Sequence, residues 1–167
     1  MKSRQSVYPS LFVVRSLNGS AIVDSKEILS KLGTFESLGK YFDLGLLYVD
    51  FPSDDPKETW RQIRDQLGPE FDLIPAFIDD RGNISYPTGL VWVQFIETPT
   101  DDELDAYARR WGLRVKARNK YMPDEATFEK MDSAFNKYLP DILESIQRDT
   151  KHVRAVSAIK ISKFKKA

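Results

Sequence analysis

His152 is the only histidine of the chain, so the sequence offers little for acid–base catalysis. No partner for it is apparent in the sequence, which leaves at most a lone general base. We therefore expect neither a catalytic triad nor a multi-histidine metal site. The expected place of His152 is partly exposed, in the turn before the last strand.

Three pairs of neighbouring aspartates could be taken for hydrolytic carboxylates. Two pairs lie where a helix is expected to begin, where negative charge is favourable, and the third lies in a turn. The pairs are Asp54-Asp55, Asp101-Asp102 and Asp79-Asp80. Cysteine is absent, as are the glycine patterns that bind phosphates or dinucleotides. We predict no enzyme activity, no cofactor and no metal site.

The charge balance predicts no general attraction to nucleic acid or to a membrane, because 25 basic side chains stand against 25 acidic ones. The 167 residues, 41% of them hydrophobic, are enough for one ordinary domain or two small ones. No apolar run approaches the roughly 20 residues of a membrane span, and no secretory segment of about 7–15 apolar residues follows the polar start. A cytoplasmic location is the default expectation.

Strands and helices are expected twice in the same order, from apolar alternation, helical spacing and caps. In the first half the expected strands are 11–17, a doubtful 40–42, 44–51 and 71–78, and the helices are 26–32 and about 53–67. In the second half the strands are 90–96, 113–119, 126–131 and 153–161, and the helices are 101–111 and about 133–148, the latter bent at Pro140. Trp60, Trp92 and Trp111 fall on apolar stripes and are expected in the core.

Each half therefore has the order β-α-β-β-α-β, which is that of the split βαβ or ferredoxin-like domain. We predict an α+β protein of two tandem ferredoxin-like units, residues 1–84 and 85–167. Each unit would be an antiparallel sheet with two helices on one face. The other face of each sheet would then be open to a partner.

The second half resembles the N-terminal propeptides of bacterial subtilisin-like serine proteases, over residues 75–167. The residues that carry the resemblance are Pro87-Thr-Gly-Leu-Val-Trp-Val-Gln-Phe95, which fits the family's Thr-Gly-x-x-x-Val-x-Phe strand, then Trp111-Gly-Leu113 and His152-Val-Arg-Ala155. The resemblance implies a folding chaperone and tight inhibitor of a protease. No Asp-x-Gly, His-Gly-x-His or Gly-x-Ser-x catalytic motif follows in this chain, so we expect a stand-alone inhibitor or chaperone.

In such propeptides the open sheet face docks on two protease helices and the C-terminal tail lies as an extra strand in the substrate cleft. Carried onto this chain, the resemblance implies a protease-binding tail of Phe164, Lys165, Lys166 and Ala167. Phe164 would take the subsite for a large apolar side chain, and Ala167 would lie at the cut. The implied partner is a subtilisin-like serine protease.

Two other hypotheses remain open. The strands Leu11–Leu17 and Leu44–Phe51 resemble the two ribonucleoprotein motifs of RNA-recognition domains, in which Phe12 and Tyr48 would stack on bases. Against this, Leu46 replaces an expected aromatic residue, and acidic residues outnumber basic ones in the first half, so nucleic acid is an unlikely partner. A self-associating module that pairs through its open sheets is the third hypothesis.

Overall fold

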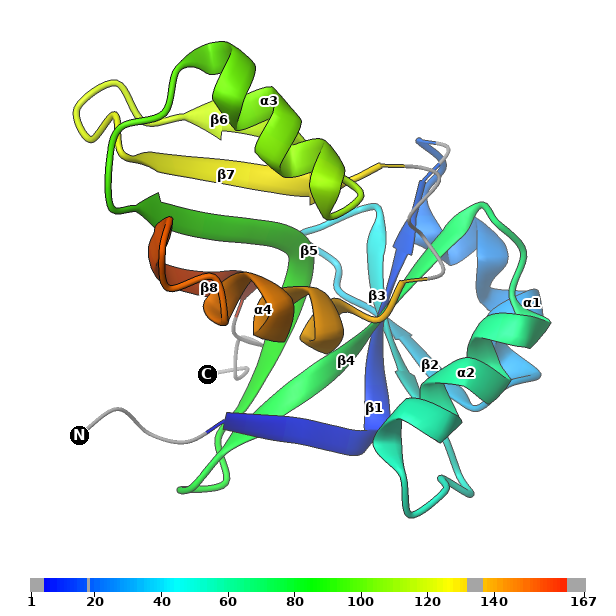
Figure 1. Cartoon of the computed structure of the whole chain (residues 1–167). Coiled ribbons are helices and arrows are strands. Elements are labelled where there is room, and N and C mark those ends of the chain that lie inside the picture. The colour runs from blue at the N-terminus through cyan, green and yellow to red at the C-terminus, as the bar shows by residue number, and fades with distance from the viewer. Residues whose placement is uncertain (1–4, 18, 132–136, 162–167) are drawn as a thin grey trace. The chain divides into compact units, whose positions relative to one another are not determined.

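The computed structural model describes residues 5–17, 19–131 and 137–161. These residues form a mixed α+β fold whose strand pairs are antiparallel (Figure 1). The strands are β1 (Gln5–Ser16), β2 (Thr34–Ser37), β3 (Leu44–Tyr48), β4 (Phe71–Asp79), β5 (Ile84–Phe95), β6 (Leu113–Arg118), β7 (Glu125–Lys130) and β8 (Val153–Ile161). The described α-helices are α1 (Lys26–Ser30), α2 (Pro56–Gln66), α3 (Asp101–Arg110) and α4 (Leu139–Gln147), and a 3₁₀ turn, η1 (Ile22–Ser25), precedes α1. None of these helices is long and apolar enough to cross a membrane.

The chain divides into two compact units. Unit 1 comprises Met1–Thr88 with Lys160–Ala167, and unit 2 comprises Gly89–Ile159. The strand order is β2-β3-β1-β4-β5-β7-β6, and β8 also pairs with β5. Strand β5 therefore serves both units, because Ile84 and Ser85 pair with β4 whereas Leu90–Gln94 pair with β7. The α+β class and the antiparallel sheet predicted from the sequence are confirmed.

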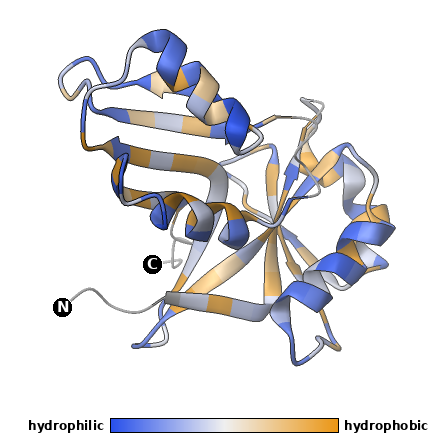
Figure 2. Ribbon diagram, viewed as in Figure 1, coloured by the Kyte–Doolittle hydropathy of each residue, from blue (hydrophilic) through white to orange (hydrophobic). Residues whose placement is uncertain are grey.

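Unit 1 is built on β1, which lies between β3 and β4 and whose residues Leu11–Val14 have no exposed surface. Figure 2 shows hydrophobic residues concentrated on these central strands and hydrophilic residues along α2. Pro75 pairs with Phe12 beside a shift in the β1–β4 register, so the irregularity expected at this proline is present. The prediction of a doubtful strand at 40–42 is wrong, because these residues form a turn. The second strand of this half is instead β2, which pairs with β3.

Unit 2 takes its shape from the alternation of side chains along β5. Val91, Val93 and Phe95 are buried, whereas the residues between them are only partly buried. Figure 1 shows α3 and α4 on the same side of this sheet. Helix α3 begins in a complete capping box, in which the Thr100 hydroxyl accepts from the Glu103 N–H and the Glu103 carboxylate accepts from the Thr100 N–H.

Helix α4 is shorter than predicted. It begins at Leu139, so Pro140 lies in its first turn, where the missing N–H breaks no helical hydrogen bond. The prediction of a bend at Pro140 is therefore wrong. Residues 137 and 138 are not helical, and residues 132–136 of the expected helix lie outside the described part of the chain. The proline that we placed inside a helix is therefore part of a start signal.

A buried guanidinium joins α2 to β4 in unit 1. Arg64 is 5% exposed, and its side chain donates to the carbonyl oxygens of Phe71 at 2.6 Å, Gly68 at 2.6 Å and Leu67 at 3.3 Å. These carbonyls belong to the C-terminal end of α2 and the chain that follows it, where backbone acceptors lack helical donors. On the same helix, the Trp60 indole N–H donates to Leu73 O at 2.8 Å. Both contacts fix α2 on the sheet.

We predict that Arg64→Met lowers the free energy of unfolding by about 2–4 kcal/mol, because it leaves three carbonyl oxygens without their cationic donor. Urea unfolding of the full chain measures this loss. The matched control is Arg61→Met in the same helix, where the arginine is 55% exposed and pairs with Glu58, so a change within about 0.5 kcal/mol is expected. Equal effects of the two substitutions would contradict the role assigned to Arg64.

Candidate functional site

The candidate docking surface is the face of the unit 2 sheet that is opposite its buried core, called here the outer face. On β5 it consists of Leu90, Trp92 and Gln94, which are partly exposed. The register places Glu129 beside Leu90 and Thr127 beside Trp92 on β7, and paired residues share a face. Trp92 thus lies in the middle of a face of mixed polarity.

The charges of the outer face are paired across strands. Glu129 accepts from Arg114 at 2.7 Å and lies 3.8 Å from Lys116 Nζ, both on the edge strand β6. Both cations are about half exposed, so these ion pairs are screened and each contributes at most about 1 kcal/mol. At the end of β5, Gln94 donates to Asp124 at 3.2 Å. The part of the outer face formed by β5, β6 and β7 therefore has no strong field of either sign to select a highly charged partner.

The opposite face of β5 leads to a partly buried cluster of titratable groups. The Phe95 ring meets the Tyr107 ring edge to face, with centroids 5.2 Å apart. The Tyr107 hydroxyl donates to Asp149 Oδ2 at 3.0 Å, and His152 Nδ1 lies 2.9 Å from Asp149 Oδ1. Burial raises the pKa of the Tyr107 hydroxyl far above its ordinary value, and the hydrogen bond to Asp149 raises it further.

Asp149 remains ionised within this cluster. Burial by itself would raise the pKa of the Asp149 carboxyl, but hydrogen bonds from His152 and Tyr107, with the charges of His152 and Arg110, hold it below its usual value. Our expectation that His152 has no partner is therefore wrong, although its partly exposed place before the last strand is confirmed. The missed signal was the spacing Asp149-x-x-His152, which brings both side chains together in the turn between α4 and β8.

A cavity of about 670 Å³ lies beside the cluster. It is lined by Phe95, Tyr107, Arg110, Lys151 and His152, among others. Glu97 and Glu103 also line it, so acids and bases are mixed and no ligand charge is favoured. Among the described residues there is no grouping of acids and histidine that could hold a metal ion. The geometry orients His152 through a carboxylate, but among the described residues no hydroxyl group is hydrogen-bonded to its ring.

The structure places some of the residues singled out in the sequence as expected and others not. The tail predicted to bind a protease, Phe164, Lys165, Lys166 and Ala167, lies outside the described residues, which end with β8 at Ile161. Trp60 is buried as predicted, but the core prediction for Trp92 is wrong, since it lies on the outer face. The aspartates at helix starts are structural, as expected. Asp55 caps α2 by accepting from Lys57 N, and Asp101 of α3 pairs with Arg118.

The two aromatic residues proposed to stack on RNA do not form one platform. Phe12 pairs with Leu47, and Tyr48 pairs with Leu11, so the two rings lie on opposite faces of the sheet. Phe12 also has no exposed surface, whereas Tyr48 is partly exposed. A base cannot stack on Phe12 in this structure.

We predict that Asp149→Asn destabilises unit 2 by about 1 kcal/mol at pH 7, because it removes the charge that accepts from Tyr107 and His152. A carboxyl whose pKa is lowered by folding stabilises the fold above its unfolded pKa, near 3.9, and loses that effect as the pH falls through its folded value. The difference between wild type and variant should therefore shrink below about pH 4.

Urea unfolding at several pH values measures this difference. Tyr107→Phe is the companion variant, because it keeps the ring beside Phe95 and removes only the hydroxyl. A difference between wild type and Asp149→Asn that does not change between pH 7 and about pH 3 would contradict the assignment.

Comparison with known proteins does not assign a family. Neither a scan against protein-family models nor a search of the curated proteins finds a match to this chain.

Proposed function

We propose that this chain is a non-catalytic, propeptide-like protein that binds a subtilisin-like serine protease and inhibits it or assists its folding. Binding would use the outer face of unit 2 and the C-terminal tail. The observation that carries the proposal is the outer face itself: a partly exposed sheet surface, centred on Trp92, in a unit whose two helices lie on the other side. Such a face is suited to lie against helices of a partner.

The strand order supports a ferredoxin-like assignment for both units. In unit 1 the elements occur along the chain in the order β-α-β-β-α-β, and the strands lie across the sheet in the order β2-β3-β1-β4. In unit 2, β6-β7-β5 with β8 on the far side of β5 repeats the same arrangement. Within this proposal, the chain consists of two tandem ferredoxin-like units, and the second carries the propeptide motifs.

The Thr-Gly motif has a structural reason in this chain. Gly89 adopts a φ of 91°, which an L-residue with a side chain rarely adopts. This residue lies within β5, just before Leu90 begins the pairing with β7. The motif that carries the resemblance therefore coincides with a backbone position that favours glycine, at the start of the outer face.

The outer face has the composition of a protein interface rather than of a nucleic-acid interface. An aromatic residue lies at its centre, Gln94 and Thr127 flank it, and the two cations of its β6 edge are already paired with Glu129. A nucleic-acid surface would instead show unpaired basic residues. In the proposal, this face supplies the area of contact and the tail supplies the specificity for the substrate cleft.

We predict that the full chain inhibits a purified bacterial subtilisin-like protease stoichiometrically, as measured with a chromogenic peptide substrate. Deleting residues 162–167 should raise the inhibition constant about 100-fold or more, because the main-chain hydrogen bonds of a cleft strand are lost. Trp92→Ala should raise it about tenfold or more, because a central aromatic anchor is removed.

The matched control is Phe51→Ala, which removes an aromatic side chain that is 93% exposed in unit 1 and lies outside the outer face. It should inhibit like the wild type. If a panel of such proteases is not inhibited, or if deleting the tail leaves the inhibition constant unchanged, the proposal is wrong. Dimerisation abolished by Trp92→Ala, with no protease binding, would instead support the self-association hypothesis.

A further inference from the structure

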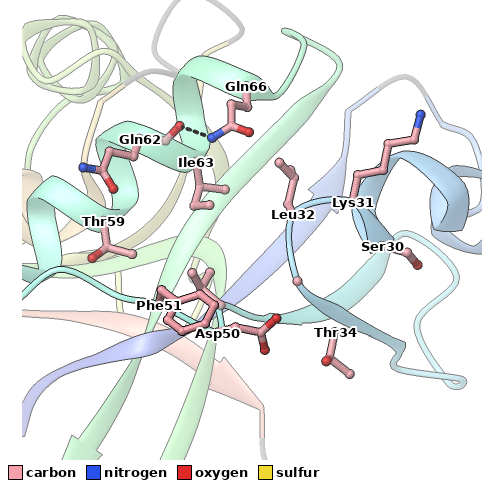
Figure 3. Close-up of a pocket in the computed structure, with 12 residues that line it drawn as sticks. Ser30, Lys31, Leu32, Thr34, Asp50, Phe51, Thr59, Gln62, Ile63 and Gln66 are labelled. Carbon is pink, nitrogen blue, oxygen red and sulfur yellow. Dashed lines mark hydrogen bonds between the residues drawn. The ribbon is translucent and has the colours of Figure 1, made fainter.

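Unit 1 contains a cavity of about 530 Å³ that the proposed function does not use. Figure 3 shows its two walls, with Thr59, Gln62 and Gln66 of α2 on one side and Ser30, Lys31 and Thr34 on the other. Asp50 and Phe51, from the loop between β3 and α2, lie between these walls. The lining thus comes from three separate segments of one unit.

Gly33 lines the cavity at a position where the backbone lies very close to β3. A Cβ atom at this position would lie 2.1 Å from the carbonyl oxygen of Tyr48, so no side chain fits there. The chain between α1 and β2 can therefore lie directly against the end of β3. This close approach brings Ser30 and Thr34 to the same cavity as Asp50.

The cavity presents both hydrogen-bond donors and hydrogen-bond acceptors. Thr59 is buried, and its hydroxyl already accepts a hydrogen bond from Ser53 N at 2.7 Å. The amide nitrogen of Gln66 donates to Gln62 O at 3.2 Å, which leaves its amide oxygen available. Ser30, Thr34 and Asp50 also line the cavity, and their side chains have no hydrogen-bond partner among the described residues, so donors and acceptors are available there.

The charges of the lining cancel, because Lys31 and Asp50 are the ionisable residues among the described residues that form it. A phosphate or a nucleic acid would therefore gain little attraction from this cavity. Binding of an uncharged polar ligand does not depend on the net charge of the lining, and the hydroxyl groups of such a ligand could both donate to and accept from the lining. The neutral, mixed character of the lining selects for a polyhydroxylated molecule.

An aromatic ring lies at the cavity with almost its whole surface exposed. Phe51 is 93% exposed, which leaves a large apolar side chain in water at a cost that folding does not recover. A flat ring beside hydroxyl-binding groups is complementary to a sugar ring, whose C–H face is apolar and whose edge carries hydroxyl groups. The lining also includes the apolar side chains of Leu32, Val49 and Ile63, and Phe51 is the most exposed of these apolar groups.

We propose that this cavity binds a neutral oligosaccharide, with a sugar ring packed on Phe51 and its hydroxyl groups bound by Asp50 and the side chains of the two walls. The carboxylate of Asp50 is the strongest acceptor in the cavity and binds two hydroxyl donors in this arrangement. The proposal concerns unit 1 alone. It does not depend on the protease-binding role proposed for unit 2.

Titration of the isotope-labelled full chain with maltotriose, cellotriose and tri-N-acetylchitotriose, followed by NMR, tests the proposal. At least one trisaccharide should bind with a dissociation constant of about 1 mM or lower and shift the signals of Phe51, Gln62 and Gln66. Phe51→Ala and Asp50→Asn should each weaken that binding about tenfold or more. Both side chains are exposed, so neither substitution should disturb the fold.

The matched controls are Phe42→Ala and Asp54→Asn. Phe42 is 62% exposed, Asp54 is exposed in the same loop as Asp50, and neither lines the cavity. Both control variants should bind like the wild type. No binding of any of the three sugars at about 10 mM would overturn the proposal. So would tighter binding of the anionic trigalacturonate, binding only of a Ser/Asn-rich peptide, or sugar binding that Phe51→Ala leaves unchanged.

Discussion

The alternation of side chains along β5 is the constraint on which unit 2 depends. Because successive residues of a strand point to opposite faces, burying Val91, Val93 and Phe95 commits Leu90, Trp92 and Gln94 to the outer face. The same choice places the Phe95 ring against Tyr107, whose hydroxyl then reaches Asp149. A slip of one residue would bury Trp92 and Gln94 and expose this contact. One strand therefore determines both the outer face and the contact of Tyr107 with Asp149 behind it.

The two units share an order of elements but differ in what they expose. The central strands of unit 1 have no open face, since Leu11–Val14 and Leu46 and Leu47 are fully buried. Its exposed features lie instead on the loops around α2, where Phe51 and the polar side chains line a cavity. Unit 2 keeps a partly exposed sheet face. A repeated order of strands thus carries different surfaces, because function depends on sites and not on the fold.

Electrostatics in this chain is local. The side-chain charges balance overall. Three charged side chains also have partners close by: Arg64 donates to carbonyl oxygens, Asp149 accepts from Tyr107 and His152, and Glu129 pairs with two cations. Such pairs fix side chains but create little long-range field. Both proposed partners, a protein and a neutral sugar, are recognised by shape and hydrogen bonding, which suits this distribution.

The sequence by itself determined the α+β class, the order of strands and helices, and most of their positions, because apolar periodicity and capping residues act over a few neighbouring positions. It also located Pro75 at an irregularity and Asp55 at a helix start. Only the tertiary structure decided which face each residue takes. Trp92 and Val93 look equally apolar in the sequence, but packing of the helices against one side of the sheet buries only Val93. The contact of Tyr107 with Asp149 and the cavity at Phe51 join segments distant in the chain, and such contacts depend on long-range packing that local patterns do not encode.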